Sequence, residues 1–149
     1  MKTKVNEISI RYREKLSMKE APKITSSQSA SDLFYQNWDI DQLYLQECFK
    51  VMLLNNANRV KGILEVSKGG ITGTLVDVRI IFGVALKSMT TAMILAHNHP
   101  SGTLKPSMPD RTITVKIQKA AEFLDIKLLD HLIISPYSEY FSFADEGIL

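Results

Sequence analysis

The sequence is poor in cysteine and contains no long apolar run. Its single cysteine, Cys48, excludes an internal disulfide framework and is typical of a reducing compartment. No apolar run approaches the roughly 18 residues that a membrane-spanning helix requires. The first 30 residues are polar and charged, unlike a secretion signal. These absences predict a cytoplasmic protein without membrane partners.

A strong net charge and a phosphate-binding loop are missing as well. The formal net charge of +2 is too small to indicate a nucleic-acid binder. The run GGITG at residues 69–73 is not followed by the GK[ST] that a nucleotide loop requires. The positive surplus lies in residues 1–23, which hold seven Lys/Arg against three Glu. We expect a solvated arm there, with weak nucleic-acid contact as the alternative.

The chain is long enough for one hydrophobic core, and its balance of 45% hydrophobic and 23% charged residues is that of a globular protein. Residues 1–24 are expected to form a partly ordered N-terminal arm, and residues 25–149 a single domain. The sequence does not indicate an oligomeric state.

Strand and helix patterns alternate along the domain. This alternation predicts an α/β fold with a mixed β-sheet flanked by about three helices. A short helix is expected to be capped by Ser29 or Ser31, and a second by Asp77. The remaining expected elements are strands at Cys48–Leu54, Val60–Ser67, Thr91–Ala96 and Lys127–Ser135, helices at Val78–Met89 and Met108–Leu124, and an edge strand in the tail YFSFADEGIL.

Two of the three histidines lie in one stretch, HNHPSGTLKPSMPD. Side chains alternate on an extended backbone, so His97 and His99 are expected on one side and Asn98 on the other. Pro100 ends the strand, and the loop leads to Asp110 at the start of a helix. Two imidazoles and one carboxylate, with one position left open, are typical of a catalytic zinc site.

A zinc hydrolase also needs a general base, and Glu47 is the best-placed candidate because it directly precedes the first core strand. Ser107 could direct its hydroxyl at the oxyanion of a tetrahedral intermediate. Both assignments have structural alternatives. Ser107 and Asp110 have the spacing of a capping box, and Glu47 could be an ordinary turn carboxylate.

Two other residues allow different chemistry. Cys48 could be a thiolate nucleophile served by a histidine, but alternation turns it away from the site if Glu47 faces the site, which favours simple burial. His131 could be a ligand or could orient one. We favour a structural or ligand-orienting role for His131, because no spacing ties it to the cluster.

His97-x-His99-Pro100, Ser107 and Asp110 resemble the H-x-H-P…S-x-x-D signature of the JAMM (MPN+) metalloproteases. The runs HNHPSG, PSMPD and LLDHLII more narrowly resemble the RadC family of bacterial JAB-domain proteins, over roughly residues 25–149. The resemblance implies a JAB/MPN, cytidine-deaminase-like fold, with zinc bound by His97, His99 and Asp110. It also implies that Glu47 activates water and that Ser107 assists the oxyanion.

The sequence differs from that family in two ways. In longer RadC proteins this domain follows a segment that resembles a helix-hairpin-helix region. No such region precedes the domain in this sequence, so DNA contact by that route is not expected. The family commonly carries Pro-Arg-Glu at the start of the helix before the histidine strand, where this chain has Val78-Arg79-Ile80. The function of that glutamate is therefore not expected in this protein.

These observations lead to a main hypothesis and two alternatives. The main one is a zinc-dependent peptidase or isopeptidase acting on a protein or peptide substrate. The first alternative is a DNA-repair or mobile-element associated protein that binds DNA or a protein partner without peptidase activity. The second is a catalytically silent binding module that retains the fold.

Overall fold

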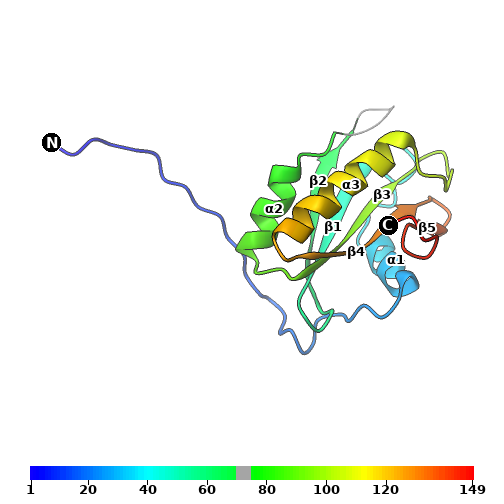
Figure 1. Ribbon diagram of the computed structural model, residues 1–149, viewed down its shortest axis with the longest axis horizontal. Helices are drawn as coiled ribbons and strands as arrows, with labels where there is room; N and C mark the ends of the chain where they lie inside the picture. The colour runs from blue at the N-terminus through cyan, green and yellow to red at the C-terminus, as the bar shows by residue number, and fades with distance from the viewer. Residues whose placement is uncertain (70–74) are drawn as a thin grey trace.

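A computed structural model describes residues 1–69 and 75–149, so most of the glycine-rich run at 69–73 lies outside the described residues. The helices and strands alternate as expected (Figure 1). In chain order they are α1 (Ser27–Gln36), β1 (Cys48–Leu54), β2 (Val60–Lys68), α2 (Val78–Lys87), β3 (Ala92–Asn98), α3 (Met108–Phe123), β4 (Lys127–Ile134) and β5 (Tyr140–Ser142).

The strands form one mixed sheet in the order β2-β1-β3-β4-β5. β1 pairs antiparallel with both β2 and β3, β3 pairs parallel with β4, and β4 pairs antiparallel with β5. The parallel pair needs a crossover, which α3 provides. The predicted α/β fold with a mixed sheet is therefore confirmed, and the central strand β3 carries the histidines.

Apolar side chains divide between the two faces of the sheet. On one face, α1 packs through Ala30 and Phe34 against residues of β1, β3 and β4. On the other face, α2 and α3 pack through Phe82 and Ile117, among others, against Phe49 and its neighbours (Figure 1). Alternate residues of β1 and β3 thus enter different cores, which is why both strands are buried at every position.

The start of α1 differs from the prediction. Ser26 is the N-cap: its Oγ accepts from the Ser29 N–H, and its own N–H donates to Ser29 Oγ, so the two serines form a capping box. Neither Ser29 nor Ser31 caps the helix. Several serines in a row make the cap ambiguous in the sequence, and the pairing of Ser26 with Ser29 places the start earlier.

β3 is longer than its apolar pattern indicated. The strand continues through His97 and Asn98, which pair with Ile133 and Ile134 of β4. His97 also faces Phe49 of β1. The two polar residues extend the strand because β4 pairs with both of them, and β1 also pairs with His97, so His97 is held inside the sheet.

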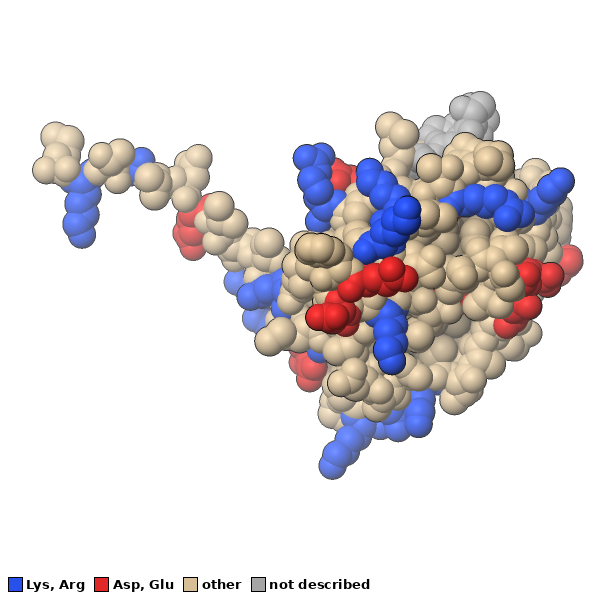
Figure 2. Space-filling view, viewed as in Figure 1, with Lys and Arg blue, Asp and Glu red and all other residues tan. Residues whose placement is uncertain are grey.

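The N-terminal segment runs away from the domain as an extended arm (Figure 1). Its apolar residues Val5 and Ile8 are exposed, at 88% and 89%. Figure 2 shows Lys and Arg along this arm, and a mixture of basic and acidic side chains on the visible face of the domain. Nucleic-acid contact through the arm remains a prediction. Among the described helices, none has the length and apolar character to cross a bilayer.

Candidate metal centre

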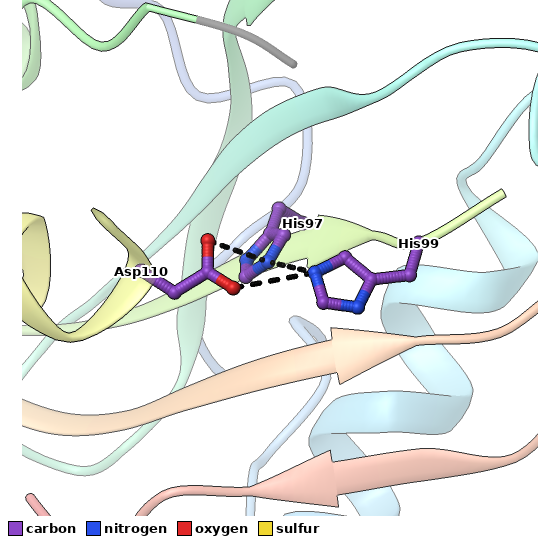
Figure 3. Close-up of side chains that lie close together, drawn as sticks. All are labelled: His97, His99 and Asp110. Carbon is purple, nitrogen blue, oxygen red and sulfur yellow. Dashed lines mark hydrogen bonds and ion pairs between the residues drawn. The ribbon is translucent and has the colours of Figure 1, made fainter. Parts of the chain in front are cut away.

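The candidate metal centre lies between the end of β3 and the start of α3, where three side chains point toward one another (Figure 3). His97 Nε2 lies 3.0 Å from His99 Nε2. The two Asp110 oxygens lie 3.3 Å from these nitrogens, Oδ1 from His97 and Oδ2 from His99. One ligand atom from each residue falls within 4.8 Å of the others. The structure thus brings together the three residues that the sequence nominated as ligands.

A backbone carbonyl fixes the orientation of the His99 ring. His99 Nδ1 lies 2.7 Å from the carbonyl oxygen of Thr103. A carbonyl oxygen only accepts, so Nδ1 carries the proton and donates it. In the neutral ring the lone pair of His99 Nε2 therefore faces the centre.

A chain of three hydrogen bonds fixes His97 in the same way. Thr114 Oγ1 donates its only proton to the carbonyl oxygen of Asp110, 2.6 Å away. It must therefore accept from His131 Nδ1, which is also 2.6 Å away. His131 Nε2 then accepts from His97 Nδ1 at 2.8 Å. The lone pair of His97 Nε2 is consequently directed into the centre as well.

This chain requires a neutral His131, and its surroundings provide for that. The ring is fully buried, and burial together with the neighbouring His97 holds the pKa of His131 well below its usual range. Phe143 stacks on the His131 ring with centroids 4.6 Å apart. Phe49 stacks on His97 at 6.1 Å. His131 is therefore a packed residue that orients a candidate ligand, the role that the sequence favoured for it.

Two imidazole lone pairs and a carboxylate thus converge on one point with no hydrogen between them when both rings are neutral. Burial opposes the charged form of His99, but its bonds to Asp110 and Thr103 prevail and raise the pKa of this ring. Burial likewise opposes the Asp110 charge, yet His97 and His99, which in their protonated form donate to this carboxylate, hold the pKa of that carboxyl well below its usual range. The centre therefore favours a cation, and its donors suit a divalent metal ion.

Ser107 and Asp110 form the capping box of α3. Asp110 N–H donates to Ser107 Oγ at 3.1 Å, and Ser107 N–H donates to Asp110 Oδ2 at 2.8 Å. The structural alternative raised by the sequence is therefore present, and the same carboxylate still faces both histidines. Accepting from Asp110 leaves the hydroxyl proton of exposed Ser107 available to donate elsewhere.

Glu47 reaches the centre from the loop before β1, with Oε1 3.8 Å from His99 Nε2. Asn98, fully buried, holds the backbone on both sides of Glu47. Its Oδ1 accepts from the Cys48 N–H at 2.7 Å, and its Nδ2 donates to the Gln46 carbonyl at 2.9 Å. Asn98, which lies between the two histidines, thus positions the Glu47 carboxylate from the opposite face of the sheet.

Cys48 faces away from the centre, as strand alternation predicted. It packs in the core beneath α1. Burial, followed by its contact with Glu65, raises the pKa of the thiol to about 12. The thiolate alternative is therefore excluded at neutral pH.

Sequence reasoning did not assign roles to Thr114 and Asn98. The sequence contains an indication of each role. Thr114 lies four residues after Asp110 in a helix, where a hydroxyl can bond the preceding carbonyl. Asn98 alternates into an apolar core, where an amide must find hydrogen-bond partners. Neither signal names the partner, because His131 and the loop before β1 are distant in the sequence.

If this centre binds a divalent metal ion, we expect Thr114→Val to weaken that binding by about 10- to 100-fold, because His131 loses the acceptor that sets its tautomer and His97 loses its orientation. Competition with a chromophoric chelator measures the affinity. Thr112→Val is the matched control. Its hydroxyl makes the same type of bond, to the Met108 carbonyl at 3.0 Å, but is exposed and takes no part in the chain to His131. Equal affinities in both variants would contradict the role given to Thr114.

Comparison with known proteins identifies the family. Residues 24–148 match the family model described as the RadC-like JAB domain. A UPF0758 protein of Flavobacterium johnsoniae is 51% identical over 126 residues, covering 85% of this chain and 53% of that protein. A UPF0758 protein of Porphyromonas gingivalis is 48% identical over 104 residues, covering 70% of this chain and 46% of that protein.

A more distant UPF0758 protein, from Clostridioides difficile, is 36% identical over 119 residues, covering 75% of this chain and 50% of that protein. The chain thus spans about half the length of the curated relatives it matches. The family model covers nearly all of the domain that carries the His97, His99 and Asp110 cluster. The chain therefore belongs to the RadC family, with a RadC-like JAB domain at residues 24–148.

Proposed function

We propose that this protein is a zinc-dependent hydrolase that cleaves a peptide or isopeptide bond. One observation carries the proposal: the Nε2 lone pairs of His97 and His99 and the Asp110 carboxylate face one another across about 3 Å, with each ring locked from its far side. Membership of the JAB domain superfamily, which includes metalloproteases, supports it.

The donor set suits a catalytic ion better than a structural one. Two imidazoles and one carboxylate are three protein ligands, whereas structural zinc is normally held by four, mostly thiolates. Zinc held by His97, His99 and Asp110 would supply Lewis acidity, polarising a carbonyl and lowering the pKa of a water molecule.

Glu47 and Ser107 supply the remaining groups. The Glu47 carboxylate would accept the proton of the attacking water and return it to the leaving amine, which its position 3.8 Å from His99 permits. Ser107 lies in the capping box with Asp110, and its hydroxyl would donate to the developing oxyanion. In this proposal each group that moves or stabilises charge lies on a capped helix start or a hydrogen-bonded loop.

The test is a cleavage screen of the zinc-loaded chain against a peptide library that includes isopeptide-linked members, read by mass spectrometry. We expect a defined set of products that disappears when a chelator removes the metal and returns on addition of zinc. Intact peptides throughout, with zinc demonstrably bound, would reject the hydrolase in favour of a binding module.

A further inference from the structure

A solvent-accessible cavity of about 240 Å³ adjoins the candidate metal centre. Its inner wall consists of site residues, namely Glu47, His97 and Asp110. Nothing in the proposed chemistry accounts for the rest of this space. The remainder of the cavity is therefore available to a part of the substrate other than the scissile bond.

The other lining residues are apolar. Phe49 comes from β1, Leu75 and Val76 from the segment before α2, and Pro109 and Ile113 from the first turns of α3. Leu75 lines the cavity and is 92% exposed. Apolar side chains that gather around a cavity, with a few polar groups beside them, are typical of a site that binds another molecule.

Size and charge limit what the cavity can hold. Its volume is below the roughly 300–1,000 Å³ typical of sites for drug-sized ligands. It therefore suits one side chain rather than an extended ligand. The only charged groups lining it among the described residues are the carboxylates Glu47 and Asp110, and no described cation is present to pair with an acidic side chain.

We propose that this cavity binds a large aliphatic side chain, of leucine or methionine size, on the substrate residue next to the scissile bond. This inference rests on the proposed hydrolase function, because a carbonyl at the metal centre places its neighbouring side chain against the apolar wall. The substrate class is then a peptide with a bulky apolar residue at the cleaved position.

Amino-acid hydroxamates test the cavity without requiring a known substrate, since the hydroxamate group binds zinc and only the side chain differs. Titration calorimetry on the zinc-loaded full chain would compare glycine, leucine and lysine hydroxamates. We expect leucine hydroxamate to bind about 10- to 100-fold more tightly than glycine hydroxamate, the gain from burying such a side chain. Lysine hydroxamate should bind less tightly than leucine hydroxamate.

Variants test whether the preference for leucine hydroxamate arises in the cavity. Leu75→Ser changes an exposed residue and should reduce the preference for leucine over glycine hydroxamate several-fold, while Ile113→Trp, which fills the cavity, should abolish it. Leu86→Ser is the control, since Leu86 is half-exposed on α2 and does not line the cavity. Glycine hydroxamate should bind equally to the wild-type chain and Leu86→Ser, and Leu86→Ser should keep the full preference for leucine hydroxamate.

The outcomes separate the two proposals. Equal affinity for glycine and leucine hydroxamates, or a preference for lysine, overturns the side-chain cavity and leaves the hydrolase intact. Failure of every hydroxamate to bind a chain that holds zinc overturns the hydrolase itself, because the metal then has no open position.

Discussion

Glu47→Gln should lower the rate of peptide cleavage by about 10²- to 10⁴-fold, the usual contribution of a general base, while the chain keeps its zinc. Glutamine has the shape of glutamate, but its amide cannot take up the proton of the attacking water. Asn98 holds the backbone around Glu47 through the neighbouring residues rather than through the Glu47 side chain. The fold should therefore tolerate the exchange.

The measurements are initial rates on a peptide identified by the library screen and zinc content by atomic absorption. Glu65→Gln is the control, because Glu65 is a nearby carboxylate on β2 whose contacts are with Cys48 and Lys68, outside the site. A Glu47→Gln protein with zinc bound and an undiminished rate would show that the proton is moved by another group.

The fold was largely predictable because apolar periodicity reflects burial directly. The strand Cys48–Leu54 has the predicted bounds, and its largely apolar character, interrupted at Lys50, follows from the helices on both faces. The pattern failed where polar residues belong to a strand. His97 and Asn98 extend β3 because β4 lies alongside, and only the sheet order supplies that partner.

The candidate ligands were predictable for a different reason. His99 directly follows β3, two residues after His97, and Asp110 lies in the first turn of the next helix, so the three residues are close in the sequence as well as in space. The groups that orient them depend on contacts between distant segments. His131 meets His97 because β3 and β4 are parallel neighbours, and Thr114 meets His131 because α3 packs over β4. The spacing of residues in the sequence does not encode such a register.

Asp110→Asn should weaken zinc binding by more than the roughly 10- to 100-fold that loss of an outer-shell partner costs, because it removes a charged ligand from the metal. An asparagine oxygen can still accept from the Ser107 N–H, so the start of α3 should persist. Asp77→Asn is the matched control. Asp77 is also a carboxylate at a helix start, but it caps α2 and pairs with Arg79.

The pH dependence of zinc affinity is a second test of the same centre. His99 has a raised pKa in the metal-free chain, so its proton must leave before Nε2 can bind a metal. Affinity should therefore fall about tenfold for each pH unit below the pKa of His99 and level off above it. Asp110, with its pKa well below the usual range, stays ionised near neutrality and adds nothing to this slope.

His99→Ala tests whether the proton that competes with the metal is the one on His99. Removing the ring should weaken zinc binding at every pH and also flatten the slope, because the competing proton is lost with it. Chelator competition between pH 5.5 and 8.5, around the ordinary histidine pKa of about 6.5, measures both effects. A steep slope that survives in His99→Ala would contradict the assignment of the competing proton to His99 and place it on another group.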